Sequence, residues 1–214
     1  MILLRIYRGI KSRVIQLLVN HLPYFRFIRE PQNPTQHIDF SLWYRQKVLG
    51  YNSSAYWPMN ATSRVTHAKN ILVGKGSFPG FMPGCYIQGI GHIYIGDFSI
   101  FSANVGIISA NHDIYDSSVH QHSAVRIGSY CWIGMNAVIL PGVSLGDYTI
   151  VGAGAVVTKS FPDGYCVIGG NPAKVIKVLD REKCKLYKMD GSAYHGYIRE
   201  DKFDEFAQTN LNLP

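Results

Sequence analysis

An aliphatic residue recurs every six positions in the second half of the sequence, and this period limits the fold more than any other feature. From Ile127 to Pro162 the chain divides into the hexads IGSYCW, IGMNAV, ILPGVS, LGDYTI, VGAGAV and VTKSFP. An α-helix repeats every 3.6 residues and a simple strand every two, so neither explains this period. Hexads of this form are typical of a parallel β-helix, in which each hexad supplies one short strand and three hexads complete a triangular coil.

The same register extends upstream and is then interrupted. The hexads IGDFSI, FSANVG and IISANH begin at Ile95 and end at His112, and fourteen residues, Asp113 to Arg126, separate them from Ile127. Fourteen is not a multiple of six, so this segment cannot continue the coil. We therefore predict a loop over 113–126 that leaves a corner of the prism, with His112 at the corner shared by Ser144 and Pro162.

The rest of the chain is organised around this repeat. We expect an N-terminal helical and cap segment over 1–60, a β-helix over 61–177 that begins with irregular turns, and a C-terminal helix and tail over 178–214, with the helix over 180–189. The stretch from Ser53 to Val65 contains Tyr56 and Trp57. These rings either cover the open end of the prism, which we favour because the first coil needs a cover, or stack on a sugar.

Residues Ile93 to Lys177 resemble the hexapeptide-repeat acyltransferases. The sequence IGSYCWIGMNAVILPGVSLGDYTIVGAGAVVTKSFPDGYCVIGGNPAKVIK is similar to the branch with galactoside and maltose O-acetyltransferases and the acetyltransferases of polysaccharide biosynthesis. The resemblance implies an all-β fold, a left-handed parallel β-helix, with an amphipathic helix before it and a short helix and tail after it. It also implies a homotrimer with active sites between subunits, acetyl-CoA as acyl donor, and a sugar or glycan acceptor.

The resemblance also assigns roles to individual residues. His112 matches the family's general base, and its neighbours Asn111 and Asp113, with Asn104 in SAN, match acceptor-binding positions. The coenzyme positions fall on Ala153, Thr158, Lys159, Lys174, Lys177 and Trp132. An alternative for Asp113 is to orient the imidazole, and Trp132 fits either the coenzyme groove or a corner. A neutral imidazole suits this chemistry because it can take the proton of an attacking hydroxyl.

Composition and charge limit the cofactors and partners that we expect. The formal net charge is +7, and the four cysteines show no CxxC spacing, so we expect reduced thiols, no metal, and no nucleic-acid partner. Cys131 falls on an inward hexad position and is interpreted as a core thiol. His120 and His122 are interpreted as polar loop residues rather than metal ligands.

The first twenty residues combine apolar residues at helical spacing with Arg5, Arg8, Lys11 and Arg13. They predict a basic amphipathic helix that is too charged to span a bilayer. Packing on its own protein and lying on an anionic membrane both remain open. The resemblance thus implies a cytoplasmic O-acetyltransferase, and we expect it at the inner face of the membrane if the helix lies on an anionic bilayer. An N-acetyltransferase of an amino-sugar nucleotide or small amine, and a non-catalytic scaffold, are the alternatives.

Overall fold

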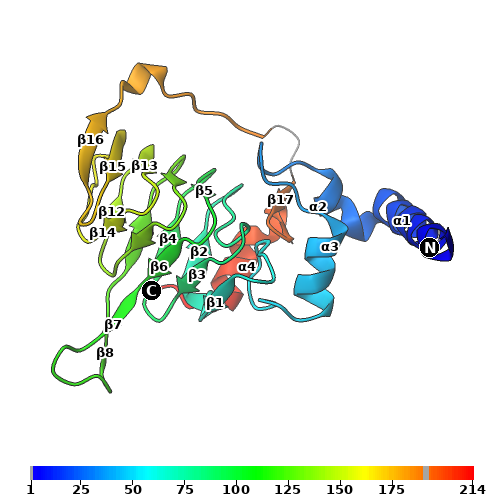
Figure 1. Ribbon diagram of the computed structural model, residues 1–214, viewed down its shortest axis with the longest axis horizontal. Coiled ribbons are helices and arrows are strands. Elements are labelled where there is room, and N and C mark those ends of the chain that lie inside the picture. Colours follow the sequence, from blue (N-terminus) through cyan, green and yellow to red (C-terminus); the bar gives the residue numbers. More distant parts are fainter. Residues whose placement is uncertain (1, 190–192) are drawn as a thin grey trace.

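The computed structural model describes residues 2–189 and 193–214, with side chains described from residue 12 onward. Its centre is a three-sided prism of short parallel strands that stack along one axis (Figure 1). The first face consists of β1 (Arg64–Thr66), β3 (Tyr86–Gln88), β6 (Gly106–Ile108), β11 (Val138–Ile139) and β14 (Val156–Val157). The second face consists of β2 (Ile71–Val73), β4 (Ile93–Ile95), β9 (Val125–Ile127) and β12 (Ser144–Leu145). The third face consists of β5 (Ile100–Phe101), β10 (Trp132–Ile133), β13 (Thr149–Val151), β15 (Cys166–Gly169) and the antiparallel edge strand β16 (Lys174–Val178).

The predicted hexad register is confirmed strand by strand. The first residues of hexads three apart pair directly on each face, as in Ile107↔Ile139↔Val157. The other two faces stack in the same way, as Ile95↔Ile127↔Leu145 and Phe101↔Ile133↔Val151. All of these side chains are buried, and burying one aliphatic side chain contributes about 1.5–3 kcal/mol. The hexad period therefore produces a continuous apolar core along the prism axis.

The interruption begins earlier than the sequence predicts. The chain leaves the prism at Ala110, and it returns at Ser123, whose N–H donates to the carbonyl of Ser109. Ser144 pairs with Arg126 rather than with His112, so the predicted corner shared by His112, Ser144 and Pro162 is wrong. The physical reason is that β6 and β9 can continue the stack with Ser109 and Ser123 joined directly. The thirteen intervening residues, 110–122, then form a projecting arm that includes His112 (Figure 1).

Aromatic rings form a column along the corner between the second and third faces. The rings of Phe98, Tyr130, Tyr148 and Tyr165 stack in sequence with centroids 5.6, 5.3 and 5.5 Å apart. All four residues have positive φ, a conformation that costs a non-glycine residue about 1–2 kcal/mol. Ring stacking and the covering C-terminal segment offset this cost.

That C-terminal segment is a strap rather than the predicted helix over 180–189. Only Arg181–Lys183 forms a 3₁₀ turn, and the following residues run extended past the aromatic column. The Tyr130 hydroxyl donates to the Tyr187 carbonyl at 3.0 Å, and the Arg181 guanidinium lies 4.6 Å from the Tyr165 ring centroid. Packing on the column thus overrides local helix propensity.

The N-terminal end of the prism is closed by its own cap. The Trp57 and Tyr56 side chains are buried in the core, and the Trp57 indole donates to the Pro79 carbonyl at 2.8 Å. The capping interpretation of Ser53–Val65 is therefore confirmed, and buried rings leave no surface for a sugar to stack on. The tail after the strap also reaches this end, as β17 (Tyr194–His195), β18 (Ile198–Arg199) and α4 (Phe203–Asn210).

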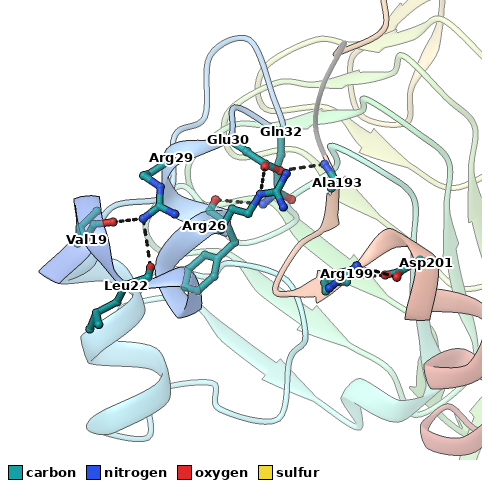
Figure 2. A network of polar contacts seen from close by, with 10 residues as sticks. Val19, Leu22, Arg26, Arg29, Glu30, Gln32, Ala193, Arg199 and Asp201 are labelled. Carbon is teal, nitrogen blue, oxygen red and sulfur yellow. Dashed lines mark hydrogen bonds and ion pairs between the residues drawn. The ribbon is translucent and has the colours of Figure 1, made fainter.

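Outside the cap lie α1 (Ile2–His21), α2 (Arg26–Arg29) and α3 (Phe40–Trp43), which continues into a π-helical turn, Tyr44–Val48. The predicted N-terminal helix is confirmed as α1, which projects away from the prism (Figure 1). Figure 2 shows its attachment: the Arg29 guanidinium donates to the Val19 and Leu22 carbonyls at the C-terminal end of α1. Among the described side chains of α1, Val14, Leu17 and Leu18 remain 40% to 60% exposed.

Candidate active site

The arm is a β-hairpin formed by β7 (Ala110–His112) and β8 (His120–His122). Two aspartates close its turn. One Asp113 carboxylate oxygen accepts the backbone N–H groups of Tyr115 and Asp116, and an Asp116 carboxylate oxygen accepts the hydroxyl and N–H of Ser118. The Ser118 hydrogen bonds lower the pKa of Asp116. The sequence folds this way because Asp side chains satisfy turn N–H groups that lack backbone partners.

His112 is exposed on this arm, and its ring is held at one nitrogen. His112 Nδ1 lies 2.6 Å from the Ser117 carbonyl oxygen. A carbonyl only accepts hydrogen bonds, so this contact requires Nδ1 to carry the proton. The neutral ring then presents its lone pair at Nε2, which is the arrangement that a general base needs.

The hairpin separates His112 from its sequence neighbours. Paired residues Asn111 and Gln121 lie on one face of the ribbon, and the paired His112 and His120 lie on the other. The Gln121 amide donates to the Asp113 carboxylate, so the Asp113 side chain lies on the face of the ribbon that carries Asn111 and Gln121. The option that Asp113 orients the His112 imidazole is therefore wrong. As acceptor-binding residues, Asn111 and Asp113 stay predictions.

Asn104 and Ala153 lie at one corner of the prism, between the third and first faces. Backbone hydrogen bonds stack the turns of successive coils at this corner. Asn136 N donates to the Ala103 carbonyl in the turn of Asn104, and Gly154 N, in the turn of Ala153, donates to the Met135 carbonyl. Asn104 has a φ of 58°, a turn conformation that asparagine tolerates better than most residues. The residue type at 104 thus has a backbone reason in addition to the predicted acceptor contact.

Thr158 and Lys159 lie at the opposite corner of the first face. They follow β14, at the same corner from which the arm leaves after β6. Both side chains are exposed, and Lys159 Nζ lies 5.7 Å from the Phe161 ring centroid. The outer surface of the first face is thus bordered by Asn104 and Ala153 on one side and by Thr158, Lys159 and the arm on the other.

Trp132, Lys174 and Lys177 belong to the third face instead. Trp132 and Lys177 are outward residues of β10 and β16, and the outward Ile150 and Val167 separate them in the stack. Trp132 is 53% exposed and its indole N–H lies 3.4 Å from the Ser102 hydroxyl. Trp132 therefore covers a strand face and not a corner. Lys174 is exposed at the start of the edge strand.

Within the part of the chain that the structure describes, these residues lie in separate places: on the arm, at the two corners of the first face, and on the third face. The His112 side chain contacts Ser117 and His120 of its own arm. Three surface hollows of about 230 to 290 Å³ lie near β16 and the N-terminal cap and contain none of the predicted site residues. Within the described residues, no three His, Cys, Asp or Glu side chains gather as a metal site would require.

The interpretation of Cys131 as a core thiol is confirmed, because its side chain is 1% exposed and burial raises its pKa to about 12. The interpretation of His120 and His122 as loop residues is wrong, because both lie in β8, and the His120 ring also contacts His112. The sequence HQH carries no strand signal of its own, because all three residues are polar and exposed. The pairing of β8 with β7 could not be predicted from the sequence, because the length of the turn between these two strands was unknown.

Comparison with known proteins places the fold in a family. Residues 124–159 match the family described as bacterial transferase hexapeptide (six repeats). A maltose O-acetyltransferase from Clostridium difficile 630 superimposes with a TM-score of 0.56 at 31% identity, covering 70% of this chain and 81% of that one. The chain therefore belongs to the hexapeptide-repeat acyltransferases, and its β-helix is left-handed.

Two galactoside acetyltransferases extend the comparison. The galactoside O-acetyltransferase of Escherichia coli K12 is 32% identical over 135 residues, which are 59% of this chain and 65% of that protein. A galactoside acetyltransferase solved in complex with coenzyme A shares the fold, with a TM-score of 0.54 at 24% identity and coverage of 73% and 82%. A putative acetyltransferase of Schizosaccharomyces pombe is 32% identical over 117 residues, so the chain matches only 55% of the length of that relative and 65% of the length of the Escherichia coli protein.

Proposed function

We propose that this protein is an acetyl-CoA-dependent O-acetyltransferase that acts on a hydroxyl of a sugar or of a polysaccharide or lipid-linked glycan intermediate. The observation that carries the proposal is the 2.6 Å contact between His112 Nδ1 and the Ser117 carbonyl, which leaves Nε2 as the base. Membership in the family supports the reaction class, and the galactoside acetyltransferase solved with coenzyme A supports the donor.

In the proposed reaction, Nε2 of His112 removes the proton of the acceptor hydroxyl while its oxygen attacks the thioester carbonyl carbon. The tetrahedral intermediate then collapses, the C–S bond breaks, and the imidazolium returns the proton to the coenzyme A thiolate. General-base assistance of this kind contributes about 10²–10⁴-fold to the rate. The products are the acetyl ester and coenzyme A, so atoms and charge balance.

The coenzyme and acceptor residues are part of the same proposal. Ala153, Thr158 and Lys159 border the first face and suit the pantetheine arm, while Lys174 and Lys177 suit its phosphates as point charges. Trp132 adds a flat apolar surface, and Asn104, Asn111 and Asp113 are assigned to the acceptor. These groups belong to three separate parts of one chain, which supports sites that are completed between subunits, and the family resemblance implies that the assembly is a homotrimer.

The proposal includes peripheral contact of residues 1–20 with the inner face of a membrane. Residues 1–29 contain no acidic residue, and the exposed Val14, Leu17 and Leu18 supply an apolar side. None of the helices that the structure describes is long and apolar enough to cross a membrane. Unchanged partitioning onto anionic liposomes after deletion of residues 1–20 would contradict this contact.

The test of the function is acetyl transfer from labelled acetyl-CoA to a panel of sugars, glycans and amines, with products identified by mass spectrometry. We expect O-acetylated sugar products, and a fall of about 10²–10⁴-fold in kcat for His112→Ala. His37→Ala removes another exposed histidine and serves as the matched control. Amine products alone would assign the protein to the N-acetyltransferases, and absence of acetyl-CoA binding would identify a scaffold.

A further inference from the structure

The face of the His112 ring is covered by a second imidazole. His112 and His120 are directly opposite each other in the hairpin, with ring centroids 4.3 Å apart and planes inclined at 44°. The Asp113 N–H donates to the Val119 carbonyl beside this pair, which makes it a non-hydrogen-bonded pair of the antiparallel ladder. Side chains approach most closely in such pairs, so the contact follows directly from the backbone register.

One hydrogen bond is a weak restraint for an exposed ring. The bond from His112 Nδ1 to Ser117 fixes one atom, but water competes for both partners and the ring can pivot about that bond. A general base must hold its nitrogen within about 3 Å of the proton that it abstracts. A second contact that fixes the plane of the ring is therefore needed to aim Nε2.

The other neighbours of His112 do not supply that contact. Asp113 and Gln121 bond to each other on the opposite face of the ribbon, and His122 is opposite Ala110 rather than His112. Among the described side chains, His120 is the one whose ring lies against the imidazole. Ser117 restrains the edge of the ring and His120 restrains its face, and together they define the direction of Nε2.

We propose that His120 is a positioning residue for His112, acting by ring-to-ring contact and not by proton transfer. The proposal rests on the proposed function, because it assigns to His120 the orientation of that reaction's base. A packed aromatic ring contact accounts for a loss of up to about tenfold when it is removed. The effect falls on kcat, because a misaimed base slows the chemical step without removing a substrate contact.

The experiment compares His120→Ala, His120→Phe and the matched control His122→Ala in steady-state kinetics on the full-length protein. We expect kcat to fall about tenfold for His120→Ala with acceptor KM nearly unchanged, and most of it to return in His120→Phe, which keeps a flat ring but no nitrogen. His122→Ala should retain wild-type kcat. An unchanged kcat for His120→Ala, a loss confined to KM, or an equal loss for His120→Phe would each overturn the proposal.

A second readout does not depend on turnover. Long-range ¹H–¹⁵N spectra of the imidazoles report the tautomer of His112, which the structure requires to be protonated at Nδ1. We expect this single tautomer in the wild type and in His120→Phe, and a mixture of both tautomers in His120→Ala. If the wild type transfers no acetyl group, the proposed function fails. The spectra still decide whether His120 positions His112, and an unchanged spectrum for His120→Ala overturns that role.

Discussion

The prism and the β7–β8 arm are adjacent in sequence but are stabilised by opposite kinds of interaction. In the prism, Ile107 and Ile139 are fully buried and pair with each other along the axis. In the arm, Ile114 and Tyr115 are 85% and 94% exposed, and the turn is held by aspartate side chains. The comparison indicates that folding free energy resides in the prism, while the arm presents chemical groups to solvent or to another molecule.

The largest difference is expected from the same substitution made in the two regions. Ile139→Ala removes a fully buried side chain and should lower the free energy of unfolding by about 2–5 kcal/mol. Ile114→Ala removes an exposed one and should change it by less than about 0.5 kcal/mol. Denaturant unfolding of both variants measures the contrast, and equal losses would show that the arm is packed against something.

Two glycines of the prism differ in how much space surrounds them. A Cβ at Gly128 would lie 2.5 Å from the Asp147 carboxylate and 2.6 Å from the Asp147 backbone nitrogen, whereas a Cβ at Gly106 meets its nearest neighbour at 3.5 Å. Gly128→Ala should therefore destabilise the protein by about 1–3 kcal/mol. Gly106→Ala is the matched control and should cost less than about 0.5 kcal/mol in thermal unfolding.

Acid should weaken the capped end of the prism through His195. Burial lowers the pKa of this imidazole, although its hydrogen bond to the Val73 carbonyl and the charges of Asp97 and Glu200 oppose the shift, and Lys75 adds to it. The unfolded chain then binds the proton more readily, so stability is full above about pH 6.5 and falls as the pH decreases below it.

One such group changes the free energy of unfolding by at most about 1.4 kcal/mol per pH unit. Melting temperatures at pH 8 and pH 5.5 for the wild type and His195→Gln measure this contribution. An equally steep fall in the variant would remove His195 as the cause.

The smallest effect on global stability is expected in the arm. Asp113→Ala removes the acceptor of the Tyr115 and Asp116 N–H groups, at 2.8 and 3.1 Å, from an exposed turn. Global stability should stay within about 0.5 kcal/mol of wild type, because the prism is untouched. Hydrogen exchange at these two amides should accelerate by about fivefold, the equivalent of one lost hydrogen bond. Unchanged exchange would indicate that other contacts order the turn.

The features of the fold that were predictable from the sequence are those in which many residues repeat one role. The pairing of Phe101 with Ile133 and of Ile133 with Val151 was predictable, because each hexad places an apolar side chain at the same position. Many residues of the core share this role, so one irregular hexad does not change the fold. The cap formed by Tyr56 and Trp57 was predictable because an open β-helix end must be covered.

The features that the sequence did not predict are those whose conformation depends on a contact between distant segments. The strap over 180–189 has residues suited to a helix, but the aromatic column of Phe98, Tyr130 and Tyr148 binds it in an extended form. The arm begins three residues before the predicted position, because Ser109 and Ser123 bond to each other and bypass the intervening chain. Neither contact has a local signature in the sequence.

The hexad pattern specifies the β-helix, its register and the presence of an interruption near His112, because a six-residue period stacks short strands in one register. The tertiary structure decided that the interruption is a hairpin, that Ser117 fixes the His112 tautomer, and that His120 lies against its ring. The reason is physical: periodic burial is encoded residue by residue, whereas the pairing of two strands across a turn is set by the register that the folded backbone adopts.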